Sequence, residues 1–155
     1  MRSSVWPWVR RLFRGRAKKR AAVTALDRAR LQHSFSDLLG QSPRDEERAR
    51  IREAEQELLR ARLIKDQAHV SPDLVTMRST VLLRDLDTGA TRACSLAYPA
   101  DGVGENRISV LSSLGLALLG AQAGQLVEYQ ERGLSRQVWL EAVLYQPEAA
   151  GHFHL

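Results

Sequence analysis

The stretch SSLGLALLGAQAGQ, from Ser112 to Gln125, decides the fold because it is dense in apolar residues, spaced by glycines and free of charge. It is too short to cross a membrane as a helix, which takes about 20 apolar residues. We predict a short helix from Leu114 to Leu119, with Gly115 permitting close approach of a sheet and Gly120 ending the helix. The residues expected to point toward that sheet are Leu114, Ala117 and Leu118.

Segments with alternating apolar residues lie on both sides of this helix and predict a strongly curved antiparallel sheet, whose concave face the helix fills. The tripeptide Asp87-Thr88-Gly89 is typical of a hairpin turn, because glycine adopts positive φ without steric cost. Arg132-Gly133 predicts a second such turn. The expected strands are TVLLRDL (80–86), TRACSLAYP (91–99), NRISVLS (106–112), GQLVEYQ (124–130) and RQVWLEAVLYQ (136–146).

Two helices are expected before the sheet. TALD, residues 24–27, is typical of a capping box in which Thr24 accepts a hydrogen bond from the backbone N–H of Asp27, and Gly40 ends this helix. SPRD, residues 42–45, predicts a second start with Ser42 as N-cap and Pro43 first in the helix, which then runs to about Lys65. The apolar residues that recur at helical spacing are Leu31, Phe35, Leu38 and Leu39, then Ile51, Ala54, Leu58 and Ala61.

These patterns predict an α+β protein with an N-terminal antiparallel helical hairpin, a short coiled coil, followed by the sheet. At 1.5 Å per residue, roughly sixteen helical residues make a stalk of about 24 Å. We expect a tail over 1–23, the hairpin over 24–66 and the sheet domain over 67–155. The segment QAHVSPDLV, residues 67–75, marks the boundary, because Ser71-Pro72-Asp73 stops a helix and starts an extended chain.

The basic character of the chain is concentrated in its first twenty residues. The net charge is +5, but eight basic residues and no acid fall in that segment, and the rest of the chain has 15 basic against 18 acidic residues. Charges interrupt every apolar run, so neither a secretory nor a twin-arginine signal fits. We expect a disordered extension or an amphipathic segment on an anionic membrane or nucleic acid. The basic residues available for that contact are Arg10, Arg11, Arg14, Arg16, Lys18, Lys19 and Arg20.

No motif predicts a catalytic residue, a metal or a cofactor. Cys94 is the single cysteine, which excludes an internal disulfide, suits a reducing cytoplasm and is typical of a small buried hydrophobe. His152 and His154 form an H-x-H tail without a third ligand, and His33 and His69 stand apart in the sequence. No glycine loop of the P-loop or dinucleotide type is present.

The carboxyl half carries a family resemblance. VTMRSTVLLRDLDTG, RISVLSSLGLALLGAQAGQLVEY and the closing LYQPEAAG resemble the carboxyl-terminal domain of Rnk, the regulators of nucleoside diphosphate kinase, which belong with the Gre transcript cleavage factors. The resemblance runs from about Thr24 to Leu155, since TALDRARLQHSFSDLL is similar to the start of the family's helical hairpin. It implies an FKBP-like domain that docks at the rim of the secondary channel of bacterial RNA polymerase, with the stalk pointing inward.

The resemblance implies two groups of contact residues. The turn that enters the short helix contacts polymerase in Gre factors and reads Asp-Ser-Pro there; the matching residues are Leu111, Ser112 and Ser113, two of which differ, and Leu114 follows. Gre factors also carry acids at the stalk tip that help to hold a catalytic metal. The acids at the tip of this stalk are Asp37, Asp45, Glu46 and Glu47.

We expect a cytoplasmic, monomeric protein that binds polymerase at the channel rim and regulates transcription by excluding other channel factors. The stalk is about half as long as that of a Gre factor and should not reach the polymerase active site, so we expect no RNA cleavage and no enzyme activity. Acids in the first turn of a helix are also ordinary partners of its dipole. The alternatives are an active Gre-type cleavage factor and, by analogy of fold alone, a prolyl isomerase.

Overall fold

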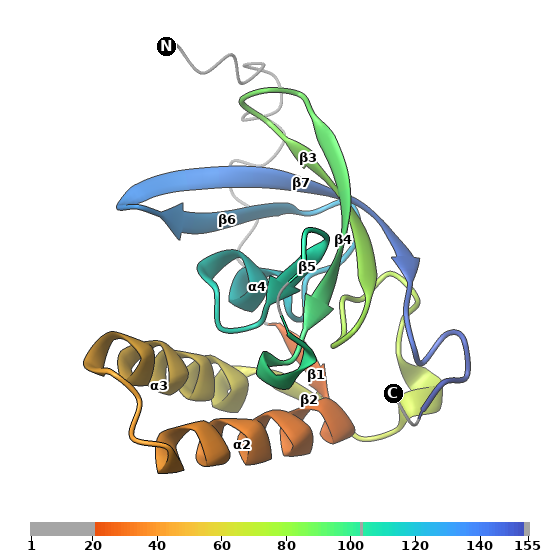
Figure 1. The fold of residues 1–155 in the computed structure, drawn as a ribbon. Helices are drawn as coiled ribbons and strands as arrows, with labels where there is room; N and C mark the ends of the chain where they lie inside the picture. The colour runs from red at the N-terminus through yellow and green to blue at the C-terminus, as the bar shows by residue number, and fades with distance from the viewer. Residues whose placement is uncertain (1–20, 103, 154–155) are drawn as a thin grey trace.

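The computed structural model describes residues 21–102 and 104–153, arranged as a helical hairpin beside a curved sheet that wraps one short helix (Figure 1). The basic residues expected to contact an anionic surface all lie outside the described residues. In the described part, the α+β class, the N-terminal hairpin and the curved, antiparallel-rich sheet with its short helix are confirmed.

The hairpin consists of α2 (Ala25–Gly40) and α3 (Asp45–Arg60). Thr24 caps α2 as expected, because its Oγ1 accepts a hydrogen bond from the backbone N–H of Asp27 at 3.1 Å. Both helices bury an apolar stripe and leave the opposite face in solvent, as amphipathic helices do. The buried apolar residues are Leu31 and Phe35 in α2 and Ile51, Ala54 and Leu58 in α3.

The predicted bounds of the second helix are wrong at both ends. Ser42 has a φ of +55° and does not cap the helix; the extended residue before α3 is Arg44. At the other end, α3 stops at Arg60 rather than near Lys65, because β2 (Arg62–Ile64) pairs in parallel with β1 (Ala22–Thr24). This pairing is non-local and uses backbone groups that a further helical turn would need.

The main sheet has the strand order β5-β4-β3-β7-β6. The turns at Gly89 and at Arg132-Gly133 have the positive φ values that the sequence predicts. The β4–β5 pair is parallel, so the expectation of a wholly antiparallel sheet is wrong there; the chain crosses over through the short helix η2 (Pro99–Asp101) before β5 begins. The strands are β3 (Thr80–Asp85), β4 (Thr91–Ala97), β5 (Arg107–Ser109), β6 (Leu126–Glu131) and β7 (Leu134–Tyr145).

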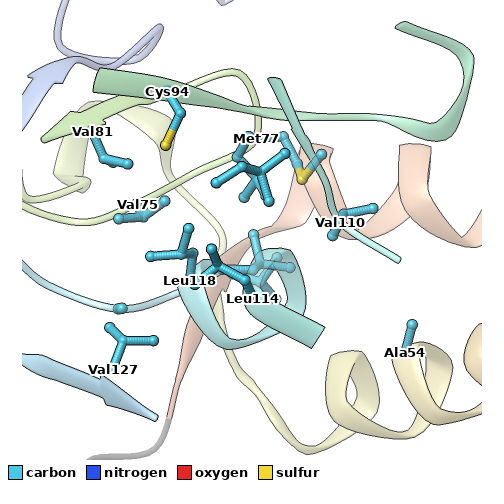
Figure 2. Packing of buried hydrophobic residues seen from close by; sticks show 14 of the residues in the cluster. Ala54, Val75, Met77, Val81, Cys94, Val110, Leu114, Leu118 and Val127 are labelled. Carbon is cyan, nitrogen blue, oxygen red and sulfur yellow. The ribbon is translucent and has the colours of Figure 1, made fainter. Parts of the chain in front are cut away.

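The short helix α4 (Ser113–Leu118) fills the concave side of the sheet, as the opening stretch predicts. In Figure 2, Leu114 and Leu118 lie among Val75, Met77 and Val127, whereas Ala117 is only half-buried. The hydrophobic cluster is continuous from the hairpin to the sheet, so both parts share one core.

Two glycines let backbone segments approach closely. A Cβ on Gly115 would lie 1.9 Å from the carbonyl oxygen of Ser109, at the end of β5. Gly120 has a φ of +79° and ends α4, and a Cβ there would lie 2.7 Å from the carbonyl oxygen of Ala22 in β1. The roles expected for both glycines are confirmed, and Gly120 additionally makes room for β1.

The closing YQPEAAG segment fastens the linker between hairpin and sheet, which includes the short helix η1 (Gln67–His69). Gln146 donates from Nε2 to the carbonyl oxygens of Ser71 and Leu74, both at 2.7 Å. Thr76 donates from its hydroxyl to Glu148 at 2.7 Å. The segment therefore holds residues 71–76 in place.

Candidate functional site

The hairpin tip is the end of the hairpin where α2 connects to α3. The tip and the turn between β5 and α4 line one open groove, which has a volume of about 650 Å³. Figure 1 shows the hairpin running along one side of the sheet domain, with α3 on the side of α4. The wall formed by α3 is charged, and the wall formed by the turn carries two serines and a leucine. The lining residues are Arg44, Asp45, Glu46, Glu47, Arg50, Ser109, Leu111 and Ser112.

The β5–α4 turn is held by its own hydroxyl groups. Ser112 caps α4, because its Oγ accepts from the backbone N–H of Gly115 at 3.0 Å and donates to the carbonyl oxygen of Ser109 at 2.6 Å. Ser113 is exposed, and its Oγ accepts from the backbone N–H of Gln130 at 3.1 Å. These contacts fix the turn before any partner arrives.

The residues predicted on this turn lie in different surroundings. Leu111 and Ser112 are half-buried and face the groove, and Ser113 is exposed outside its lining. Leu114 is 7% exposed and packs in the core. A partner that approaches the turn therefore meets Leu111, Ser112 and Ser113, while Leu114 supports them from below.

Three of the four acids predicted at the stalk tip lie together. Asp45, Glu46 and Glu47 occupy the first turn of α3, where the helix dipole stabilises negative charge. Asp37 lies on α2 outside the lining of the groove, and its carboxylate is 3.3 Å from Nε2 of His33. Within residues 21–102 and 104–153, no three acidic, histidine or cysteine side chains are grouped as metal ligands.

A buried carboxylate at the root of the hairpin was not identified from the sequence. Asp27 is 3% exposed; its Oδ2 accepts from the backbone N–H of Met77 and its Oδ1 from the hydroxyl of Tyr98, both at 2.9 Å. Burial, together with the negative charge of Glu148, raises the pKa of Asp27 from its ordinary 3.8 to about 6, against the lowering effect of these two donors and of Arg30. Burial and the charge of Asp27 raise the pKa of Tyr98.

The local pattern hid this role, because an acid at the third residue of a helix is usually a capping partner. The two partners of Asp27 lie 50 and 71 residues away in the sequence. The sequence does contain one indirect signal, because Tyr98 directly follows a predicted strand and the hydroxyl of a tyrosine needs a partner when its ring is buried. The sequence gives no means of pairing the two.

Tyr98 also contacts Arg78 and Asp101. The guanidinium of Arg78 lies 5.1 Å from the centre of the Tyr98 ring and bonds both oxygens of Asp101, at 2.8 and 3.2 Å. Asp101 also accepts from the backbone N–H of Tyr98 at 3.0 Å, and the hydrogen bond from Arg78 lowers the pKa of Asp101. Because Asp101 ends η2, shortly before β5, these contacts connect the start of α2 to the segment that leads into the β5–α4 turn.

The cysteine and the described histidines lie in surroundings that indicate a structural role rather than a catalytic one. Cys94 is buried, and burial raises the pKa of its thiol, as expected for a hydrophobic role. His152 is 2.7 Å from the hydroxyl of Tyr145 through Nδ1. His69 lies 2.7 Å from Asp66, and His154 is outside the described residues. None of the helices between residues 21 and 153 is long and apolar enough to span a bilayer.

Comparison with known proteins places these features in a family. The family model described as transcription elongation factor GreA/GreB, C-terminal, matches residues 70–145. The regulator of nucleoside diphosphate kinase from Escherichia coli K12 is 38% identical over 85 residues, which are 54% of this chain. The match spans 62% of the length of that regulator.

Two further relatives extend the match into the hairpin. Transcription elongation factor GreA from Bacillus cereus is 33% identical over 126 residues, which cover 76% of this chain and 79% of that protein. The solved structure of a GreA/GreB elongation factor from Nitrosomonas europaea superimposes with a TM-score of 0.61 and 28% identity, over 83% of this chain and all of that one. The chain therefore belongs to the GreA/GreB family.

Proposed function

We propose that this protein binds bacterial RNA polymerase at the rim of the secondary channel and regulates transcription by competing with Gre-like factors, without cleaving RNA. The observation that carries the proposal is the groove, in which Leu111 and Ser112 of the turn face Asp45, Glu46 and Glu47 of the tip. Membership of the GreA/GreB family supports polymerase as the partner. We place the protein in the cytoplasm as a monomer.

The length of the hairpin supports a binding role rather than cleavage. Each helix has 16 residues, which at 1.5 Å per residue gives a stalk of about 24 Å. Asp45, Glu46 and Glu47 line the same groove as the β5–α4 turn. A partner surface that contacts the turn would therefore also meet these acids. In this proposal they bind cationic groups at the rim, and they do not extend to a distant catalytic metal.

Each part of the chain has its own task in this proposal. Residues 67–155 dock on the polymerase and residues 24–66 present the tip. Residues 1–23 add an anionic-surface contact through their basic side chains, with membrane or nucleic acid as the surface. No residue acts as a catalyst, and no cofactor takes part.

The test measures displacement of a labelled GreA from RNA polymerase by the full chain. The charge reversal Glu46→Lys with Glu47→Lys should weaken competition at least about tenfold, a loss of 1.4 kcal/mol. The matched control, Glu53→Lys with Glu55→Lys, makes the same charge change on the same helix outside the groove and should stay within about twofold. If the protein at saturating concentration fails to displace GreA from the polymerase, the proposal is wrong.

A second assay separates binding from chemistry. Backtracked elongation complexes incubated with the protein and Mg²⁺ should release no more cleaved RNA than polymerase alone. Cleavage that appears with the native protein and disappears with Asp45→Ala and Glu46→Ala would show an active Gre-type cleavage factor instead.

A further inference from the structure

The buried carboxylate of Asp27 joins the hairpin to the sheet domain at two points. One partner, the N–H of Met77, lies just before β3, and the other, the hydroxyl of Tyr98, lies just after β4. Because β3 and β4 are antiparallel, the start of β3 lies beside the end of β4, so the two bonds run from the first turn of α2 to neighbouring segments at the same end of this strand pair. Two points of attachment restrict rotation of the helix, which one bond would allow.

We propose that Asp27 is a positioning residue that fixes the angle of the hairpin to the sheet, so that the hairpin tip and the β5–α4 turn face a partner as one surface. The effect on polymerase binding rests on the proposed function. The fixed angle itself does not depend on which partner binds.

Leverage makes the angle important. Asp27 is the third residue of α2, and Gly40 at the tip end of the helix lies 13 residues farther along, which is about 20 Å. A tilt of about 10° at Asp27 therefore moves the tip by about 3 Å. A hydrogen bond to a partner tolerates a change of only a few tenths of an ångström in its donor–acceptor distance. Such a tilt would therefore move Glu46 and Glu47 out of contact with a partner that is bound to Leu111 and Ser112.

Apolar packing at the root contributes attraction but little angular preference, because the hydrophobic effect is non-directional. Hydrogen bonds favour angles above about 150° and so select one orientation. Tyr98, one of the two partners of Asp27, is itself held in place, because its ring packs against the guanidinium of Arg78 and its backbone N–H donates to Asp101. The directional contact therefore reaches a rigid part of the sheet domain.

Three substitutions distinguish positioning from general stabilisation. In Asp27→Asn, the amide oxygen can accept from the N–H of Met77 and the amide nitrogen can donate to the hydroxyl oxygen of Tyr98, so both ties persist. Asp27→Ala removes both ties. Tyr98→Phe removes one tie and leaves the backbone tie in place.

The experiment measures the distance between spin labels on the full chain, at Gln41→Cys on the tip and Gln130→Cys on β6, in a Cys94→Ala background. We expect one narrow distance distribution with native Asp27 and with Asp27→Asn, and a broadened or shifted one with Asp27→Ala. If Asp27→Ala does not fold, Tyr98→Phe serves in its place and should broaden the distribution.

Two outcomes overturn the proposal. One is an unchanged narrow distribution in a folded Asp27→Ala variant whose only defect is a lower melting temperature. The other is an Asn variant that broadens as much as the Ala variant. In the GreA displacement assay, Asp27→Asn should compete like the native protein and Asp27→Ala at least about tenfold less well. Absence of competition by the native protein would remove the proposed function and leave the distance result standing.

Discussion

Replacing Asp27 by asparagine should stabilise the protein at neutral pH and change how its stability depends on pH. The carboxyl has a pKa of about 6 in the fold against an ordinary value of 3.8, so the folded state binds this proton more tightly than the unfolded chain. The contribution of Asp27 to stability is therefore greatest below pH 3.8, falls as pH rises, and is fully lost above about pH 6. Asparagine keeps the two hydrogen bonds without the buried charge.

The magnitude follows from the size of the shift. At 1.36 kcal/mol per pKa unit, ionisation of Asp27 costs the fold about 3 kcal/mol, of which about 2 kcal/mol falls between pH 4 and pH 7. Urea unfolding of both proteins across this range isolates the effect, because every other residue, including Glu148 and Arg30 nearby, is common to both. The advantage of Asp27→Asn should grow by about 2 kcal/mol from pH 4 to pH 7. A constant difference, or one that shrinks as pH rises, would refute this account of Asp27.

Two further substitutions test the packing around the site. Gly115→Ala should destabilise the protein by about 3 kcal/mol or more in urea unfolding, because the new Cβ meets the carbonyl oxygen of Ser109; Gly40→Ala, with open space at its Cβ, should be neutral or slightly stabilising. Equal effects of the two would contradict the close approach of α4 to β5. Gln146→Leu should cost about 1 to 3 kcal/mol, because the carbonyl of Leu74 loses its side-chain donor and the carbonyl of Ser71 keeps only the N–H of Leu74, and should speed hydrogen exchange in residues 71–76. Unchanged exchange there would show that the closing segment does not hold the linker.

Local signals in the sequence predicted the local structure well. Thr24 and Ser112 cap their helices, and Gly89 and Gly120 have the positive φ that their turns require, because each of these features depends on a few neighbouring residues. One local prediction failed, because Ser42 has a positive φ and does not cap α3. The other failures occurred where separate segments pair. No local pattern indicates that residues 62–64 leave a helix to join β1, or that β5 runs parallel to β4.

The same distinction applies to the candidate site. The turn at Leu111 and the acids near Asp45 were identified separately, each from residues adjacent in the sequence. Their meeting in one groove depends on how the hairpin lies against the sheet, which is determined by pairings across 50 residues or more. Asp27, which makes two of those pairings, has the residue type and position of an ordinary capping acid, so its role emerged only from the structure.

Hairpin length decides whether a protein of this architecture offers one contact surface or two. The root is fixed by β1 and by Asp27, so any added helix extends only the free end. Each additional turn moves the tip about 5.4 Å farther along the helix axis. Two or three turns would carry the acids beyond the β5–α4 turn and separate them into a second, remote site. With 16 residues in each helix, the acids stop level with Leu111 and Ser112, and both groups face the same groove.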